Sequence, residues 1–242
     1  MTAPTLDILV RKLELSSPLP EEDRRAILEL PFTTRSLPPA SYLIREGELP
    51  RNCYALLSGF AFRHKIVGDG GRQIVSLHIP GDALDLQGLY LDHADHNVQA
   101  LTQVELAVIP LAALHRLLSS RPAIVAAIML DILREASILR EWMANIGRRD
   151  AATRLAHLLC EFATRMDAQG LAGPDGYDLP MTQEQIGDAL GLTSVHVNRS
   201  IKALESQGLI TRAKRTLSFP RIADLRDAGD FSALYLHLPT RP

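Results

Sequence analysis

The chain has 242 residues, of which 46% are hydrophobic and 22% charged, and its formal net charge is −2. This composition is typical of a globular protein with a sizeable core and excludes a disordered chain, while the near-neutral charge means that any nucleic-acid surface must be local. Two cysteines are too few for a disulfide framework or a zinc site, so we expect reduced thiols in a cytoplasmic protein.

The N-terminal segment predicts two short helices, over residues 6–15 and 20–30. The second has the start signal LPEED at residues 19–23, in which a proline in the first turn is followed by acids that suit the positive end of the helix dipole. The segment lacks the apolar core and cleavage site of a secretory signal, and no apolar run approaches the roughly 20 residues of a membrane span. We therefore expect neither export nor membrane insertion.

A different pattern begins at Phe32 and continues to about Pro110, where short apolar runs are separated by glycines and other turn residues. Asp69-Gly70-Gly71, between HKIV and QIVSLHI, is typical of a β-hairpin turn. Several short strands with regular turns predict a β-sandwich or a small barrel.

After Pro122, the sequence AIVAAIMLDILREASILREWMANI predicts a helix of more than twenty residues with two apolar strips. A helix with two apolar sides is buried on both, so we expect one side to pack on the chain's own β-domain and the other on a second copy. The residues expected at the dimer contact are Val125, Ile128, Ile132, Leu139, Trp142 and Ile146, and the second strip contains Met129, Leu133, Ala136 and Met143. The alternative is a core helix of a monomer.

Gly147 and the charged residues 148–150 indicate a boundary or a hinge after this helix. AATRLAHLLCEFATRM follows as an amphipathic helix, and GLAGPDGYDLP follows as a loop.

The sequence MTQEQIGDALGLTSVHVNRSIKALESQGLI predicts two short helices joined by a tight turn. Thr182 and Gln185 form a capping box that begins the first helix, and Gly191 ends it in the left-handed conformation. Thr193 can cap the second helix, whose apolar face is carried by Val197, Ile201 and Leu204. This is the pattern of a helix-turn-helix, with Gly187 as the small residue where the two helices approach.

Directly after the second helix, GLITRAKRTLSF predicts two short strands around Ala213-Lys214-Arg215, which would form a basic wing. From Thr193 to Arg221 there are six Lys or Arg residues and one acid, so six minus one gives a local charge of +5 on a chain of net −2. This is the electrostatic footprint that phosphate binding requires. The alternative reading is a solvated face with a fortuitous glycine turn.

The early turns of the second helix in such a motif face base edges in the major groove. Arg199 can donate two hydrogen bonds to guanine, and Asn198 could pair with adenine in a similar way. Thr182 and Gln183, at the start of the first helix, are candidates for phosphate contacts. The full set of expected DNA contacts is Thr182, Gln183, Thr193, Ser194, Val195, His196, Asn198, Arg199, Lys202, Lys214 and Arg215.

The order of these segments resembles the Crp/Fnr family of bacterial transcription regulators, as do the stretches TQEQIGDALGLTSVHVNRSIKALESQGLI, YLIREGE, LLSGF and IPGDALDLQGLY. The resemblance implies an α+β fold in three parts: a cyclic-nucleotide-binding-like β-roll (jelly-roll) with N-terminal helices over residues 1–120, a dimerisation helix over 121–147, and a winged helix-turn-helix over 148–242. It also implies a homodimer that binds a palindromic DNA site, with an effector sensed by the β-roll and RNA polymerase as a further partner.

The chain departs from the cyclic-AMP-binding members of the family at the residues that would hold the nucleotide. The glutamate for the ribose hydroxyl falls on Leu86, and the arginine–serine pair for the cyclic phosphate falls on His96-Asn97. A phosphate without a cationic partner loses its charge-assisted bonds, so we expect no cyclic AMP binding. The expected effector pocket is lined by Leu84, Leu86, Gln87, His96 and Asn97.

Two other features also differ from well-known members. No cysteine precedes Cys53, which excludes the N-terminal iron–sulfur centre of the oxygen-sensing members. Val195 stands where members with well-known sites have a glutamate, so the half-site sequence cannot be carried over, although Arg199 is kept.

Two competing readings place the function elsewhere. His93-x-x-His96, with Asp92 and Asp95 beside it, has the residue types of a metal site, and a β-roll is similar in shape to the catalytic cupins, which would suggest a metal-dependent enzyme. The spacing is loose and the cupin histidine pattern is absent, so we interpret the segment as a polar loop and expect no metal, no cofactor and no enzyme activity. The other reading is a sensor module whose helix-turn-helix binds protein instead of DNA.

Overall fold

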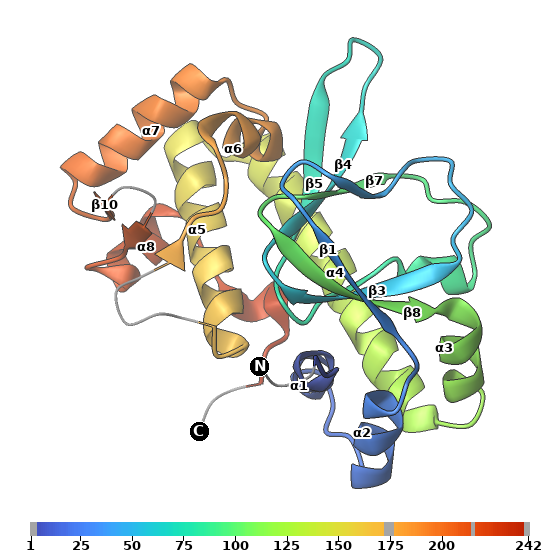
Figure 1. The fold of residues 1–242 in the computed structure, drawn as a ribbon. Coiled ribbons are helices and arrows are strands. Elements are labelled where there is room, and N and C mark those ends of the chain that lie inside the picture. Colours follow the sequence, from blue (N-terminus) through green and yellow to red (C-terminus); the bar gives the residue numbers. More distant parts are fainter. Residues whose placement is uncertain (1–3, 172–176, 214–215, 240–242) are drawn as a thin grey trace. The chain divides into compact units, whose positions relative to one another are not determined.

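The structure, a computed structural model, describes residues 4–171, 177–213 and 216–239, which divide into two units (Figure 1). The first unit contains the residues before Ile66 together with Ser76–Glu135, and the second contains Ile66–Val75 and Ala136–Leu238. The long helix α4 (Pro122–Arg148) contributes residues to both. None of the helices in the described ranges combines the length and the apolar character needed to cross a membrane.

Helices α1 (Asp7–Glu14) and α2 (Glu21–Leu28) open the first unit and confirm the two predicted N-terminal helices. Three acids occupy the first turn of α2, where the helix dipole favours them. Lys12 of α1 is buried, and its Nζ lies 2.6 Å from the Oδ1 of Asp82 in a β-turn, so α1 is tied to the sheets by an ion pair.

Two four-stranded sheets follow, with the strand orders β1-β8-β3-β6 and β2-β7-β4-β5. The first sheet is built from β1 (Thr33–Leu37), β3 (Asn52–Ser58), β6 (Ala83–Leu84) and β8 (Val104–Pro110). The second is built from β2 (Tyr42–Ile44), β4 (Ala61–Ile66), β5 (Arg72–His78) and β7 (Asn97–Ala100). The predicted β-rich region is thus confirmed, and Gly70 takes a φ of +83° in the hairpin turn between β4 and β5.

Alternating side chains of the first sheet serve two different cores. Leu56 of β3 and Leu106 of β8 face the second sheet, in a core that also contains Leu43 and Val98 of that sheet. The neighbouring residues on the same strands, such as Ala55 and Ala107, belong to a core shared with α1, α2, α3 (Leu111–Leu118) and the start of α4. One sheet therefore separates the sandwich interior from a helical layer.

Helix α4 includes Gly147 and ends at Arg148, and the next helix begins at Ala151, so the boundary predicted at Gly147 and the charged residues 148–150 is confirmed. Two of the six residues expected at a dimer contact face their own chain instead. Ile128 is 9% exposed and packs in the helical core of the first unit, and Trp142 is 5% exposed and donates a hydrogen bond from Nε1 to Glu161 at 2.9 Å.

The second unit contains the predicted helix-turn-helix and wing. Helix α5 (Ala151–Ala168) begins at Asp150, whose side chain accepts hydrogen bonds from the backbone of Ala152 and Thr153. After it come β9 (Tyr177–Asp178), α6 (Gln183–Leu190), α7 (Ser194–Ser206), β10 (Thr211–Ala213), β11 (Thr216–Ser218), α8 (Ile222–Ala228) and a short 3-10 turn over Ala233–Leu236. The three strands form a sheet in the order β10-β11-β9.

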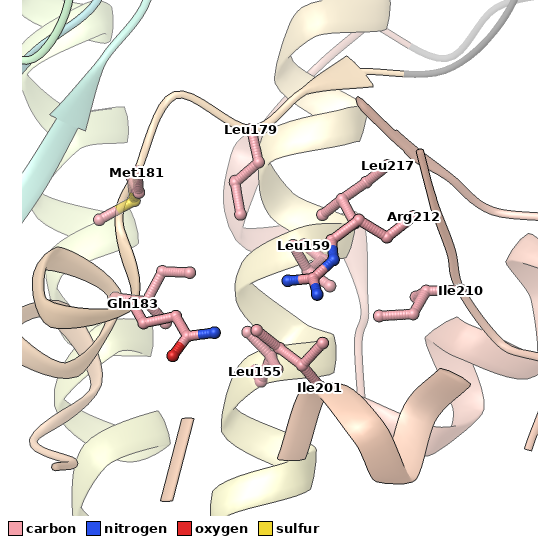
Figure 2. A pocket seen from close by; sticks show the side chains of 10 residues that line it. Leu155, Leu159, Leu179, Met181, Gln183, Ile201, Ile210, Arg212 and Leu217 are labelled. Atoms are coloured by element: carbon pink, nitrogen blue, oxygen red, sulfur yellow. The ribbon is translucent and has the colours of Figure 1, made fainter. Parts of the chain in front are cut away.

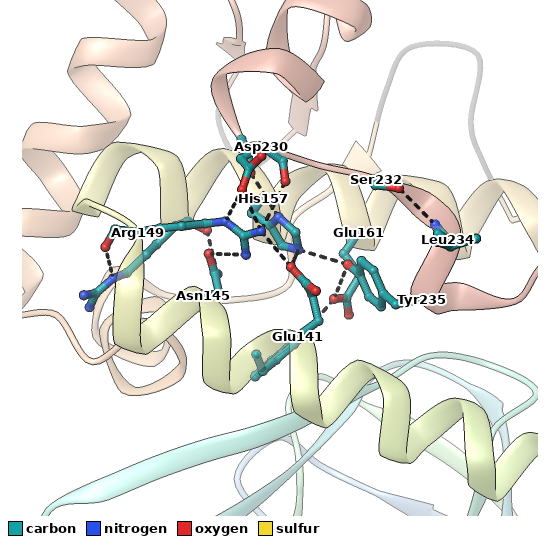
Figure 3. Close-up of polar contacts among 12 residues, drawn as sticks. Glu141, Asn145, Arg149, His157, Glu161, Asp230, Ser232, Leu234 and Tyr235 are labelled. Atoms are coloured by element: carbon teal, nitrogen blue, oxygen red, sulfur yellow. Dashed lines mark hydrogen bonds and ion pairs between the residues drawn. The ribbon is translucent and has the colours of Figure 1, made fainter.

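A polar network holds α4, α5 and the C-terminal segment of this unit together (Figure 3). Glu161 of α5 is 1% exposed and accepts hydrogen bonds from Trp142 at 2.9 Å and from the Tyr235 hydroxyl at 2.8 Å. Arg149 bonds to Glu141 at 2.7 Å and also to the C-terminal segment. Buried charges are stable only when they are paired in this way.

Candidate DNA-binding site

The start of α6 is set by the capping box that the sequence predicts. The Thr182 hydroxyl accepts from the backbone N–H of Gln185 at 3.2 Å, and the Gln185 side chain accepts from the backbone N–H of Thr182 at 2.8 Å. These two bonds satisfy N–H groups that have no partner inside the helix. Gly191 ends the helix with a φ of +64°, a conformation that favours glycine.

The turn between α6 and α7 passes very close to Gly187. A Cβ atom at this position would lie 2.4 Å from the carbonyl oxygen of Leu192. The same contact is tightened by a hydrogen bond from the Leu192 N–H to the Gly187 carbonyl at 3.0 Å. The close approach that the sequence predicts is therefore real, and it joins α6 to the turn.

Helix α7 has one buried and one exposed face. Thr193 caps it by accepting from the backbone N–H of His196, and the buried face consists of Val197, Ser200, Ile201 and Leu204. The opposite face exposes Ser194, Val195, His196, Arg199 and Lys202, and Val195 alone is 66% exposed. The structure thus brings the predicted base-reading residues together on one surface.

Asn198 and Gln183 differ from the rest of the predicted set because they contact each other. Asn198 is half-buried, and its Nδ2 lies 3.5 Å from the Oε1 of Gln183 at the start of α6. This contact joins the two helices of the motif. Part of the hydrogen-bonding capacity of both side chains is therefore used within the protein.

The basic residues of the motif are not equivalent. Arg221 forms an ion pair with Asp224 at 2.8 Å, and Arg212 lies 3.8 Å from Glu205, whereas no ion pair is recorded for Arg199 or Lys202 among the described residues. Lys214 and Arg215, the predicted wing bases, lie outside the described residues. Arg199 and Lys202 are thus the exposed cations of α7 that are available to a phosphate or a base.

Sequence reasoning missed Arg154, which fixes the end of α6. Its Nη1 donates to the carbonyl of Leu190 at 3.0 Å, and its Nε donates to the carbonyl of Arg149 at 2.8 Å. Carbonyl groups at a helix end lack partners inside the helix, so this side chain anchors α6 to the start of α5. A lone arginine on an amphipathic helix gives no sequence signal for such a role.

The residues expected to line an effector pocket are divided between the two cores of the first unit. Leu84 lies in the core between the sheets, while Leu86 packs in the helical core. Gln87 and His96 are brought together, with Nε2 and Nδ1 3.0 Å apart, and Asn97 accepts from the backbone N–H of Glu46 at 3.2 Å. The five residues therefore do not form a single pocket wall.

Charged residues that the sequence did not single out lie beside this region. Burial raises the pKa of the Asp85 carboxyl to about 6, and burial followed by the charge of Arg63 lowers the pKa of His96. Arg63 itself, on β4, pairs with Glu135 on α4. Within the described ranges, no group of three or more His, Cys, Asp or Glu side chains could hold a metal ion.

Comparison with known protein families finds a match for the helix-turn-helix region and for the β-sandwich region. The model of the Crp-like helix-turn-helix domain matches residues 153–228, and that of the cyclic nucleotide-binding domain matches residues 34–121. The FixK2 structure from Bradyrhizobium japonicum superposes with a TM-score of 0.76 at 24% identity, covering 84% of this chain and 100% of that one. This likeness shows the shared fold.

Curated relatives match over most of the chain. The chain is 30% identical over 219 residues to the transcriptional activator protein FnrL of Cereibacter sphaeroides, with 88% of this chain and 87% of the relative covered. It is 34% identical over 167 residues to the nitrogen fixation regulation protein FixK of Bradyrhizobium diazoefficiens, with 68% of each covered. It is 28% identical over 182 residues to the cAMP-activated global transcriptional regulator CRP of Escherichia coli O157:H7, with 74% and 86% covered. The chain therefore belongs to the Crp/Fnr family and is a DNA-binding transcription regulator.

Proposed function

We propose that this regulator binds a palindromic DNA site as a homodimer, with one α7 helix in the major groove of each half-site. The observation that carries the proposal is that α7 is buried on one face only, which leaves Ser194, Val195, His196, Arg199 and Lys202 exposed on the other. Exposed polar and basic groups on the early turns of this helix match the docking geometry of the motif. RNA polymerase is the further partner that we propose.

The dimer contact that we propose follows a revised strip on α4. The strip consists of apolar residues spaced alternately four and three positions apart: Val125, Met129, Ile132, Ala136, Leu139 and Met143. Ala136 is half-buried and the other five are exposed, with Met143 at 69%. This is the heptad spacing of helices that pair lengthwise. Ile128 and Trp142 are omitted because they are buried in their own chain, and Ile146 because its side chain lies near Gly191.

Adjacent residues on α4 provide a matched test of the dimer. Met143 lies on the strip, while Ala144 is exposed but turned by about 100° around the helix. Met143→Glu should place like charges opposite each other and convert the dimer to monomers, and Ala144→Glu should not. Sedimentation velocity measures the outcome, and an unchanged dimer in Met143→Glu would remove this strip from the interface.

Arg199 is proposed as a base reader, and Lys202, one turn further along α7, as a phosphate contact. Arg199→Ala should weaken binding by about 1–3 kcal/mol and relax the preference at one base position, because a bidentate contact to guanine is lost. Lys202→Ala should weaken binding to all sequences and reduce the salt slope by about 1.

Selection of bound DNA from a random pool, followed by titrations at several salt concentrations, separates the two roles. If Arg199→Ala loses affinity equally for every sequence, Arg199 is a phosphate contact. If the wild-type protein binds no DNA at any of these salt concentrations, the helix-turn-helix serves another partner.

We propose that cyclic AMP is not the effector. The support is that Leu86 is buried in an apolar core and that His96, with its pKa lowered by burial, is neutral at pH 7 and gives a phosphate no fixed charge. An effector can act only by binding one conformation better than another, and the ion pair of Arg63 with Glu135 offers a connection from the β-sandwich to α4. Calorimetric titration with cyclic AMP should show no binding, and saturable heat would overturn this point.

A further inference from the structure

A cavity of about 110 Å³ lies inside the second unit, between α5, the start of α6, α7 and the wing strands (Figure 2). Its size is close to that of an engineered cavity of about 150 Å³ that stays dry and binds benzene. It therefore has room for a single small ring or a short branched chain. Its lining residues are Leu155, Leu159, Leu179, Met181, Gln183, Ile186, Ile201, Ile210, Arg212 and Leu217.

Eight of these ten side chains are apolar, and the most buried of them come from α5 and from the position just before β10. Leu155, Leu159 and Ile210 are each 1% exposed. A wall of this kind offers water few hydrogen-bond partners, so an apolar occupant would bind without competing for polar groups. The two exceptions, Gln183 and Arg212, are hydrogen-bond donors, and they determine which polar group the ligand should have.

The Arg212 guanidinium is directed into the cavity, toward Leu159 and Ile210, as Figure 2 shows. Its Nε lies 3.8 Å from the Glu205 carboxylate, which is within ion-pair range but too long for a hydrogen bond. The side chain is 43% exposed, so it stands at the mouth and reaches inward. The Gln183 amide also points toward the cavity in this view, and its Oε1 lies 3.5 Å from the Nδ2 of Asn198.

We propose that this cavity binds a small apolar carboxylate, such as an aromatic or short branched-chain acid. The hydrocarbon part would fill the leucine and isoleucine walls, and the carboxylate would accept hydrogen bonds from Arg212 and Gln183. Arginine suits this role because its planar group donates two parallel bonds to a carboxylate. A cation would be repelled by Arg212, and a neutral molecule would gain no charge-assisted hydrogen bond from it.

Such a ligand would also oppose DNA binding, and this step rests on the proposed function. Gln183 is a candidate phosphate contact, and Arg212 belongs to β10 of the wing. A carboxylate that engages both side chains would place a negative charge beside the phosphate-binding surface. Occupancy of the cavity and loss of DNA affinity should therefore increase together with ligand concentration.

The test uses the full-length protein with 13C-labelled isoleucine methyl groups, because Ile186, Ile201 and Ile210 line the cavity. Benzoate should shift these three signals in a saturable way, and benzyl alcohol, which has the same ring without the charge, should bind more weakly. Arg212→Gln should weaken benzoate by about tenfold or more and leave benzyl alcohol unchanged. The control Arg226→Gln, an exposed arginine on α8 that does not line the cavity, should behave as wild type.

Each other outcome counts against the proposal. Unchanged isoleucine signals at millimolar benzoate would show that the cavity takes no such ligand. Equal affinity of wild type and Arg212→Gln, or of benzoate and benzyl alcohol, would show that the carboxylate is not recognised. Because the methyl shifts are recorded without DNA, a failure of DNA binding would leave this result intact, and saturable benzoate binding without competition against DNA would overturn only the coupling.

Discussion

Two helical glycines with opposite surroundings allow the packing of the helix-turn-helix to be tested. Replacing either by alanine gains about 0.5–1 kcal/mol of helix stability, because glycine loses more backbone entropy on folding. At Gly147, near the end of α4, a Cβ atom meets nothing within 4 Å, so no clash opposes the gain. At Gly187 in α6 a Cβ atom would lie 2.4 Å from the carbonyl oxygen of Leu192. The two residues are also joined by a hydrogen bond from the Leu192 N–H to the Gly187 carbonyl, so the turn cannot move away freely.

The Gly187→Ala variant must therefore displace the turn, and overpacking of this kind costs about 1–3 kcal/mol. Subtracting the helix gain leaves a net loss of about 1–2 kcal/mol, so the two variants should differ by about 2 kcal/mol. Urea denaturation followed by circular dichroism measures the difference, and DNA titration should show weakened binding for Gly187→Ala alone. Equal stability of the two variants would refute the claim that the close approach at Gly187 sets the geometry of the motif.

Three further predictions concern buried groups. Burial lowers the pKa of His157, so the unfolded chain binds more protons between that pKa and about 6.5, and the free energy of unfolding should fall as pH drops through this window; a His157→Asn variant with an equally steep pH dependence of its urea midpoint would contradict this. Burial raises the pKa values of the Cys53 and Cys160 thiols to about 12, so neither should react with a thiol dye at pH 7.5 in the native protein, and fast labelling would reveal an exposed thiolate. Glu161→Ala removes the acceptor of Trp142, the single tryptophan, and should cost about 2–4 kcal/mol with a shifted fluorescence maximum, whereas an unchanged spectrum would mean that this bond is not formed in solution.

The features that sequence predicts best are those whose chemistry is local. The capping box of Thr182 and Gln185, the left-handed Gly191 and the cap at Thr193 each depend on neighbours within three residues, and the structure confirms all of them. The hairpin at Gly70 is of the same kind. Capping and turn geometry compete with few distant contacts, so residue type and spacing are enough to identify them.

Features that depend on distant contacts were assigned less well. Periodicity shows that α4 has two apolar strips, but it cannot show which strip its own chain covers. Trp142 lies on the buried side because Glu161, nineteen residues further along, accepts its N–H. The role of Arg154 cannot be predicted from the sequence, because it depends on the end of α6 lying beside this side chain.

The ion pair between Lys12 and Asp82 bears on how proteins of this design can be recombined. The two residues are 70 positions apart, and their side chains are 9% and 8% exposed, so replacing Lys12 alone removes the cation that pairs with the buried Asp82 carboxylate, at a cost of about 3–5 kcal/mol. A chimera that joins this β-sandwich to the leading segment of a relative must therefore supply a cation at position 12, or also replace Asp82. The N-terminal segment that carries Lys12 and the turn after β5 that carries Asp82 should therefore be taken from the same parent protein. The junctions of a chimera should lie outside both segments.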